Sequence, residues 1–468
     1  MTYRWRVTVP ADLPLWTAAA IAAATGGTAS TDFTANGVAF DSREVGPGDL
    51  FVALSGEATD GHRFADQAFA QGAAGAIVAR PVDGPHVLVD DTTVALNQLA
   101  TASRARTASR IIGVTGSVGK TGTKEALFAA LDRITHGNAH RSVKSYNNHT
   151  GVPLSLARMP ATCDAAVFEM GMNHAGELAQ LTRLVRPEVA IVTTIAPAHT
   201  EFFTGEDAIA RAKGEIFEGL VDGGIAIIPF DSPHRDTLIA AARPHAAKIV
   251  TFGLRDGADV CAIEHVRMSG GDSFVTARLG TREVSYTLAP PGEHWVANSL
   301  AVMAAVDAIG GDLGVAGLAL ADLAGLAGRG ARRKVTLAGG EALLIDESYN
   351  ANPASMRATL KVLAAERADR RIAVLGEMRE LGESSDAYHA ALAVPIDEAG
   401  VSRAVLVGQG MLPLAKALEG RIETVHVPDA ATAAQVLSDL LLPGDAVLVK
   451  GSNGVGLARV VADLWGQG

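Results

Sequence analysis

A glycine-rich run contains the residue types that bind a triphosphate. It extends from Gly113 to Thr121, reads Gly-Val-Thr-Gly-Ser-Val-Gly-Lys-Thr, and lies between the apolar pair Ile111-Ile112 and a helix-like stretch that ends at Ile134. A strand, a glycine turn and a helix in this order present backbone N–H groups and a helix N-terminus to an anion. The side chain of Lys120 would add a positive charge, and the Thr121 hydroxyl would bind Mg²⁺.

The spacing of this run departs from the usual pattern. Val114 stands where GxxxxGK[ST] has its first glycine, so the loop reads Thr-Gly-x-x-Gly-Lys-Thr. A glycine-rich strand-to-helix turn with a surface lysine is the structural alternative. We favour a bound nucleotide, ATP, and the expected contacts are Thr115, Gly116, Ser117, Val118, Gly119, Lys120 and Thr121.

Single polar residues after other apolar runs are further candidates. Glu169 ends the run Ala165–Phe168. A Mg²⁺-binding carboxylate belongs at such a strand end, although a helix-capping role fits the position nearly as well. His199 follows the next apolar run and, taken alone, is an ordinary loop histidine. Lys213 lies in a helix-like stretch, where a solvent-facing side chain is the simplest interpretation.

Two turns in the last third of the chain could also contact a ligand. The first is Tyr349-Asn350-Ala351-Asn352-Pro353. It could be purely structural because Asn and Pro form turns, or its aromatic and amide groups could frame a flat base. The second, Lys450-Gly451-Ser452, suits a phosphate or a carboxylate.

The alternation of strand-like and helix-like stretches predicts the architecture. At about 150 residues per domain, a chain of 468 residues would hold about three domains. Apolar runs separated by helices are typical of parallel sheets covered on both faces. We predict an α/β protein with a small α/β first domain, a central doubly wound, mostly parallel sheet, and a C-terminal Rossmann-like domain. The predicted boundaries are residues 1–109, 110–328 and 329–468.

Composition excludes several classes of function. The net charge of −11 argues against nucleic acid as the main partner, since phosphate contacts need clustered Lys and Arg. The two cysteines, Cys163 and Cys261, show no metal-ligand spacing and suit a reducing compartment. No stretch approaches the roughly 20 apolar residues of a membrane span.

These candidates, taken in order along the chain, resemble the motifs of the ATP-dependent Mur ligases of peptidoglycan synthesis. Each motif is weak alone, but the ordered series is specific and runs almost from end to end. It comprises Asp41-Ser42-Arg43, Asp60-Gly61-His62, Thr115–Thr121 with Lys124-Glu125, Asn147–Pro153, Glu169-Met170-Gly171, His199, Lys213-Gly214-Glu215, His294 with Asn298, Asp346–Pro353, Leu375–Gly382 and Lys450-Gly451-Ser452.

The resemblance implies roles for these positions. Lys120 would bind the β- and γ-phosphates, Thr121 and Glu169 one Mg²⁺, and His199 with a carbamylated Lys213 a second. Carbamylation needs a neutral amine, so nearby cations would have to lower the lysine pKa from about 10.4. The other implied contacts are Ser42 and Arg43 for the UDP end of the sugar-peptide, Asn147 and Asn148 near the acyl phosphate, and His294, Asn298, Arg332, Asp346 and Asn350 for the nucleotide.

The resemblance also implies a reaction. The motifs are most similar to the branch that adds D-alanyl-D-alanine to UDP-N-acetylmuramoyl-tripeptide through an acyl phosphate, with ADP, phosphate and a pentapeptide precursor as products. The first domain would bind the UDP-sugar, the second ATP. The ligands would be these small molecules and two Mg²⁺ ions. The protein would be a cytoplasmic monomer, with no nucleic-acid partner and no stable membrane insertion. The implied catalytic residues are Lys120, Glu169, His199, Lys213 and Asn148.

Some positions depart from the family pattern. Glu347 stands where the motif often has a second aspartate, and Asn453 stands where an arginine is frequent. Arg329 and Arg332 compete for the linker arginine, and the spacing to Asp346 favours Arg332.

Three rival functions stay open. A sister ligase that adds diaminopimelate or lysine would carry an Asp-Asn-Pro-Arg turn, which this sequence lacks. A folate-polyglutamylating ligase would not need the first-block motif Asp41-Ser42-Arg43. A P-loop switch or scaffold would bind ATP without joining two substrates.

Overall fold

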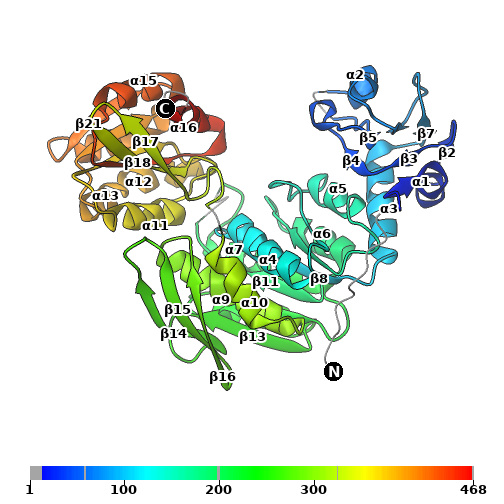
Figure 1. Cartoon of the computed structure of the whole chain (residues 1–468), viewed down its shortest axis with the longest axis horizontal. Helices are drawn as coiled ribbons and strands as arrows, with labels where there is room; N and C mark the ends of the chain where they lie inside the picture. Colours follow the sequence, from blue (N-terminus) through cyan, green and yellow to red (C-terminus); the bar gives the residue numbers. More distant parts are fainter. Residues whose placement is uncertain (1–12, 57–58, 198–200, 324, 466–468) are drawn as a thin grey trace.

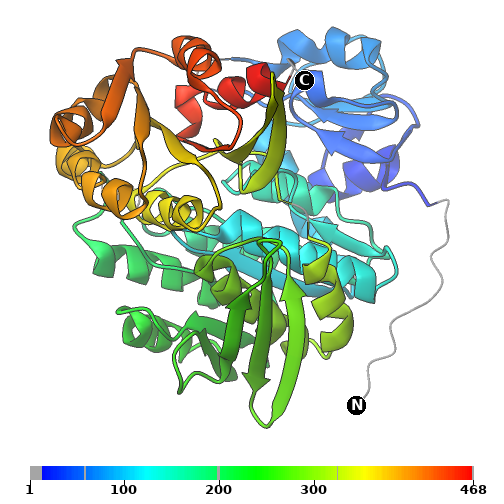
Figure 2. The same cartoon turned by 60° about the vertical axis from the view of Figure 1, so that its left-hand side comes forward.

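The structure, a computed structural model, describes residues 13–56, 59–197, 201–323 and 325–465. These residues form three α/β domains in chain order, drawn blue, cyan-to-green and yellow-to-red in Figure 1. The first and third domains both rest on the central one, and Figure 2 shows the same arrangement from another side. The predicted fold class is confirmed.

The first domain is built on a five-stranded sheet in which β2 is antiparallel and the other pairs are parallel. Its last helix packs on α5 of the central domain, so the two domains share part of a core. In sheet order the strands are β2 (Thr28–Ala29), β7 (His86–Leu88), β6 (Gly75–Val78), β5 (Asp49–Val52) and β4 (Gly37–Ala39). The other elements are the ribbon β1 (Trp16–Thr17) and β3 (Thr34–Ala35), α1 (Ala18–Thr25), η1 (Ser42–Glu44), η2 (Gly61–Phe64), α2 (Ala65–Ala70) and α3 (Thr92–Ala105).

The central domain has a nine-stranded sheet, parallel from β9 to β14 and antiparallel from β14 to β16. Separate apolar clusters cover its two faces, one with α4, α9 and α10 and the other with α5 to α8. In sheet order the strands are β16 (Arg282–Leu288), β15 (Ser273–Leu279), β14 (Val260–Arg267), β13 (Lys248–Gly253), β12 (Ile225–Pro229), β11 (Val189–Val192), β8 (Arg110–Thr115), β10 (Ala165–Glu169) and β9 (Ala139–Arg141). The helices are α4 (Lys120–Ile134), α5 (Gly151–Ala157), α6 (Glu177–Val185), α7 (Glu206–Gly214), η3 (Glu215–Gly219), α8 (Arg235–Ala242), α9 (Glu293–Ala308) and α10 (Leu313–Ala321).

The third domain has a six-stranded sheet that is parallel except for its first strand. Apolar clusters again cover both faces, as a Rossmann-like domain requires. In sheet order the strands are β17 (Ala331–Leu337), β18 (Gly340–Glu347), β22 (Asp445–Lys450), β19 (Arg370–Gly376), β20 (Arg403–Val407) and β21 (Glu423–Val427). The helices are α11 (Pro353–Ala364), η4 (Gly382–Ser384), α12 (Ser385–Ala390), α13 (Ala393–Glu398), η5 (Gln409–Met411), α14 (Leu412–Leu418), α15 (Ala430–Leu440), η6 (Asn453–Val455) and α16 (Ala458–Trp465).

Membrane insertion finds no support among the helices. Within the described ranges, none of them combines the length and the apolar character that crossing a bilayer requires.

A buried ion pair fixes β22, the strand that carries Lys450. Two nitrogens of Arg370 donate to the two carboxylate oxygens of Asp445 at 2.8 and 2.6 Å, and the Asp445 side chain is 1% exposed. We expect Asp445→Ala to lower the free energy of unfolding by about 2 kcal/mol, because it removes a buried carboxylate that accepts from Arg370 and from the Leu442 N–H. Urea unfolding measures this change. The matched control is Glu423→Ala, because the Glu423 side chain is 55% exposed in its pair with Arg403; a comparable loss in that variant would contradict the argument.

Candidate active site

A cavity of about 540 Å³ lies between the central and third domains. Its walls come from the glycine-rich loop after β8, the start of α9, the linker before β17, and the first turn of α11. Of the residues predicted from the sequence, the cavity brings together Ser117, Val118, Gly119, Lys120, Thr121, Asn147, Glu169, His294, Asn298 and Asn350. A second hollow, between α4 and α10, contains none of the predicted residues.

The backbone of the glycine-rich loop lies so close to its neighbours that a side chain would not fit at Gly116. Gly116 has φ +151°, and a Cβ atom there would lie 1.9 Å from Oγ1 of Thr193. Gly119 lies in the left-handed region at φ +87°, directly before α4. The Lys120 ammonium donates to the Gly116 carbonyl at 2.6 Å, so the lysine folds back over the loop. Val114, the departure from the usual pattern, is a buried residue of β8, and the turn therefore begins at Gly116.

Glu169 meets the loop at the carboxyl ends of two neighbouring parallel strands. The Thr121 hydroxyl donates to one carboxylate oxygen at 2.8 Å, and the Asn147 amide donates to the other at 2.7 Å. The Glu169 carboxylate is thus directed to the loop. The next helix, α6, begins only at Glu177, so Glu169 does not cap a helix.

This pair of oxygens fits the chemistry of a Mg²⁺ ligand set. A hydroxyl and a carboxylate oxygen 2.8 Å apart can occupy neighbouring positions of an octahedral ion with bonds of about 2.0–2.1 Å. Among the described residues, no group of three His, Cys, Asp or Glu side chains could hold a metal by itself. Phosphate and water would therefore have to supply the other ligands.

Lys213 is buried, contrary to the interpretation as a solvent-facing helix residue. It lies on α7 with 0% exposure, and its ammonium nitrogen has no hydrogen-bond partner among the residues that the structure describes. Burial lowers the pKa of Lys213 well below its usual value, and the charge of nearby Lys120 lowers it further. From the sequence, nearby cations were expected to lower this pKa. In the structure, burial lowers it more than the charge of Lys120 does. His199, the predicted companion of Lys213, lies outside the described residues.

The start of α9 supplies the wall opposite the third domain. Asn298 is 7% exposed and approaches Gly119, so it supports the loop that precedes α4. Burial, together with the charge of Lys450, lowers the pKa of His294 to about 4. His294 is therefore a neutral imidazole at physiological pH and can act as a hydrogen-bond donor or acceptor.

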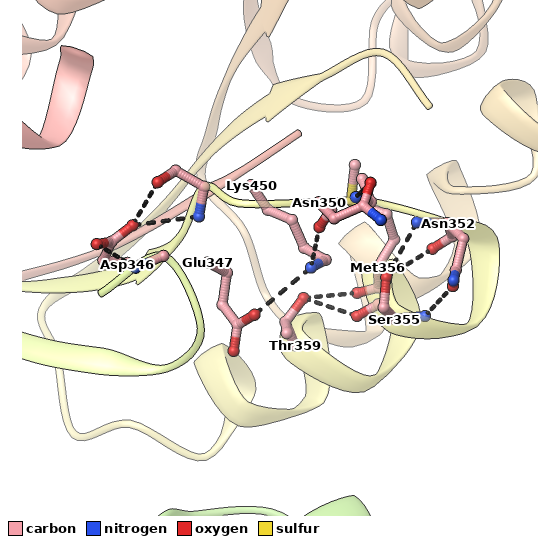
Figure 3. Close-up of polar contacts among 11 residues, drawn as sticks. Asp346, Glu347, Asn350, Asn352, Ser355, Met356, Thr359 and Lys450 are labelled. Carbon is pink, nitrogen blue, oxygen red and sulfur yellow. Dashed lines mark hydrogen bonds and ion pairs between the residues drawn. The ribbon is translucent and has the colours of Figure 1, made fainter. Parts of the chain in front are cut away.

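Lys450 connects the two predicted turns of the third domain. Figure 3 shows its ammonium between the Asn350 carbonyl, at 2.9 Å, and the Glu347 carboxylate, at 3.5 Å. Burial lowers the pKa of Lys450, while Glu347 opposes this shift and Arg329 adds to it. Burial likewise raises the pKa of Glu347. The buried ammonium of Lys450 therefore holds the turn at Asn350 through the backbone carbonyl of that residue.

Comparison with known proteins identifies the family. Three family models match in order: "Mur ligase family, catalytic domain" at residues 34–104, "Mur ligase middle domain" at 114–306, and "Mur ligase, glutamate ligase domain" at 332–453. The UDP-N-acetylmuramoyl-tripeptide–D-alanyl-D-alanine ligase of Escherichia coli is 37% identical over 441 residues, which cover 93% of this chain and 95% of that protein. The chain belongs to the Mur ligase family.

Solved structures agree with this assignment. A crystal structure of MurF from Acinetobacter baumannii matches with a TM-score of 0.82 and 33% identity, covering 97% of this chain and 99% of the other. The MurF ligase of Thermotoga maritima in complex with ADP matches with a TM-score of 0.76 and 26% identity, covering 92% and 99%. The resemblance to Mur ligases found in the sequence is confirmed.

Of the two candidate linker arginines, the structure places Arg329, and not Arg332, in the wall of the cavity. Arg329 lines the cavity, with its guanidinium 4.2 Å from the ring centroid of Tyr349. Arg332 is absent from the cavity wall because Glu366 binds its guanidinium through two hydrogen bonds. Spacing to Asp346 favoured Arg332, but spacing alone does not reveal the carboxylate of Glu366 that binds it, and a nucleotide contact at Arg332 stays a prediction.

Asp346 has a different place from the one expected. Its buried carboxylate accepts from the Gly328 N–H at 2.7 Å and from the Ser348 hydroxyl at 2.6 Å. The structure does not bring this carboxylate to the cavity wall. Asp346 instead binds the linker to the third domain at Gly328, the residue that precedes Arg329.

Three further predicted residues lie away from the cavity. The Asn148 side-chain oxygen accepts from the Gly151 N–H at 2.9 Å and so serves the start of α5. Ser42 donates to Gln67 at 3.0 Å inside the first domain, and Arg43 is an exposed partner of Asp41. Ser42 and Arg43 are nevertheless linked to the site, because the neighbouring Glu44 binds the segment before Asn147.

Sequence reasoning gave no site role to several residues that line the cavity. Trp295 follows His294 directly, and Glu347 had been noted only as a departure from the motif. Arg379 lies inside the quoted motif Leu375–Gly382, which was the available signal. The other residues without a predicted role include Ser145, Asn173, Ser355 and Thr359.

The buried amine of Lys213 has a consequence for stability. Its pKa in the folded protein lies below the unfolded value of 10.5, so the unfolded state binds more protons and stability increases with pH below that value. We expect Lys213→Met to raise the melting temperature by roughly 3–5 °C at about pH 7 and by less as the pH approaches 10.

Thermal unfolding of the nucleotide-free protein in buffer depleted of carbon dioxide measures this difference. Lys248→Met, at an exposed lysine of β13, is the matched control and should leave the melting temperature unchanged. A destabilised Lys213→Met variant, or an equal gain at every pH, would refute the explanation.

Proposed function

We propose that this Mur ligase joins D-alanyl-D-alanine to UDP-N-acetylmuramoyl-tripeptide, with ATP converted to ADP and phosphate. The product is the UDP-muramoyl-pentapeptide precursor of peptidoglycan. The observation that carries the proposal is the meeting of Thr121, Glu169 and Asn147 at a glycine-rich loop that faces a second domain across a cavity. The name of the E. coli relative, aligned over nearly the whole of both chains, supports the choice of substrates.

The reaction proceeds by activation of an acyl group. A carboxylate oxygen of the tripeptide attacks the γ-phosphorus of ATP, the bond to the β-phosphate oxygen breaks, and ADP leaves. The amine of the dipeptide then attacks the acyl carbon, and phosphate departs with its oxygen as the amide forms. Lys120 and the loop N–H groups hold the phosphates in line. Asn147 orients the Glu169 carboxylate toward the reacting groups.

The ligands of Mg²⁺ belong to this proposal. Thr121 and Glu169 would hold one ion, and Mg²⁺ would neutralise phosphate oxygens where charge develops. A second ion would use His199 and a carbamylated Lys213. The low pKa of Lys213 supports carbamylation, because a neutral amine is the form that reacts with carbon dioxide.

The first domain would hold the UDP end of the substrate, with Ser42 and Arg43 as contacts. Glu44, the next residue, accepts from the Lys144 ammonium at 2.5 Å and the Tyr146 hydroxyl at 2.9 Å. Tyr146 directly precedes Asn147, so the UDP-binding turn is connected to the Glu169 cluster. We also propose a cytoplasmic monomer with domain boundaries near residues 109 and 328.

The carboxylate of the incoming dipeptide needs a cation that the rest of the site leaves available. Lys120 belongs to the phosphates, Lys450 is buried against Asn350, and the Arg329 guanidinium packs on the ring of Tyr349. Arg379 lines the cavity with a 54% exposed side chain, donates to the Gly454 carbonyl at 3.1 Å and lies 3.5 Å from Glu377. We therefore assign this carboxylate to Arg379.

Removal of that guanidinium should weaken one substrate alone. We expect Arg379→Ala to raise the KM for D-alanyl-D-alanine about tenfold, the loss of one charge-assisted hydrogen bond, and to leave the KM for ATP unchanged. Initial rates of phosphate release measure both constants. Arg459→Ala, on exposed α16, is the matched control. Equal changes in both constants would argue against this placement.

The proposed activity is tested by phosphate release from Mg²⁺-ATP with mass spectrometry of the product. UDP-N-acetylmuramoyl-tripeptide with D-alanyl-D-alanine should give phosphate and a pentapeptide, and Lys120→Met should lose at least 10²-fold in rate because charge stabilisation is removed.

The rival functions give different results in the same assay. Turnover only with the dipeptide precursor and diaminopimelate or lysine would move the enzyme to the preceding ligation. Binding of ATP without turnover in any mixture would favour a P-loop switch or scaffold and reject the ligase.

A further inference from the structure

A carboxylate at the end of α11 is shared by two arginines from two domains. Glu366 is 6% exposed and follows the last turn of α11. Arg267, at the end of β14 in the central domain, donates to its Oε1 at 2.7 Å. Arg332, in the first strand of the third domain, donates to the same oxygen at 2.9 Å and also binds Oε2. We call Arg267, Glu366 and Arg332 the charge cluster.

The central domain reaches this cluster through a long hairpin. β14 and β15 extend beyond the body of the sheet toward α11, as Figures 1 and 2 both show. Arg267 also donates to the Ala365 carbonyl at 2.6 Å, so the guanidinium binds both the backbone and the side chain at the helix end. Hydrogen bonds between charged groups are the strong ones, and burial of Glu366 strengthens them further.

The opposite end of α11 lies in the cavity. Asn352 caps the helix by accepting from the Ser355 N–H at 2.9 Å, and Ser355 and Thr359 line the cavity wall beside Asn350. The 12 residues of α11 span about 18 Å at 1.5 Å per residue. One rigid helix thus joins the nucleotide wall at its N-terminus to the charge cluster at its C-terminus.

We infer that Arg267 and Glu366 are positioning residues, which fasten α11 to the central domain and thereby set the nucleotide-binding wall opposite the glycine-rich loop. The inference rests on the proposed function only in taking ATP as the ligand of the cavity. Arg332 holds Glu366 from within the third domain, whereas Arg267 supplies the connection between the domains. The linker at Gly328, held by Asp346, is a separate attachment of the same domain.

Loss of Arg267 should therefore weaken nucleotide binding while the fold is kept. In Arg267→Ala the Glu366 carboxylate remains paired with Arg332, so no buried charge is orphaned. We expect the Kd of a non-hydrolysable ATP analogue and the KM for ATP to rise about tenfold, with kcat changed by less than about twofold. Arg267→Lys should recover part of the affinity because it restores one donor.

Arg282→Ala is the matched control, since Arg282 belongs to β16 of the same sheet and pairs with Asp307 inside the central domain. Its nucleotide affinity should equal that of the parent protein. Distances between spin labels at Glu283→Cys and Glu419→Cys report the placement of the third domain, and both native cysteines are buried. The distance distribution should broaden in Arg267→Ala and remain narrow in Arg282→Ala.

An unchanged analogue Kd and an unchanged distance distribution in Arg267→Ala would overturn the inference. So would a fall in kcat without a change in affinity, which indicates general damage to the site. Analogue binding and label distances do not require turnover, so they decide this inference even if the parent protein fails to ligate the proposed substrates.

Discussion

The burial of basic side chains around the cleft is the constraint on which the rest of the site depends. Lys213, which has no hydrogen-bond partner among the described residues, lies near Lys120, while Lys450 lies near Arg329 and His294. Burial lowers the pKa of each of these lysines and of the imidazole. The protonated forms of these groups are therefore costly to hold in the empty protein, and a polyanion is the ligand that stabilises them. The preference for a nucleoside triphosphate is thus a property of the whole cleft and extends beyond the glycine-rich loop.

The local part of the site could be predicted from the sequence because its geometry follows from consecutive residues. The loop from Gly116 to Thr121 is fixed by the strand before it and the helix after it. Glu169 ends the neighbouring parallel strand, and the carboxyl ends of parallel strands meet at one edge of a sheet. The α/β architecture followed from the same alternation of apolar runs and helices.

The other parts of the site depend on contacts between distant segments. Arg329 and Arg332 are three residues apart. Only Arg332 is bound by Glu366, a residue far along the chain, and this contact keeps Arg332 from the cavity wall. Asp346 directly precedes Glu347, which lines the cavity, yet the carboxylate of Asp346 is bound to the Gly328 N–H. Burial of Lys213 results from the packing of α7 on α8 and the central sheet, which the charged residues of its own helix do not reveal.

The positions of these charges connect ligand binding to the arrangement of the domains. Lys120 belongs to the central domain and Lys450 to the third, and both line the cavity between these domains. Like charges on opposite walls repel each other while the cavity is empty, and a polyphosphate between them replaces that repulsion with attraction from both sides. Nucleotide binding must therefore favour the approach of the two walls. Because the C-terminal end of α11 is fastened at the charge cluster, such an approach would move that end least and the turn at Asn350 most.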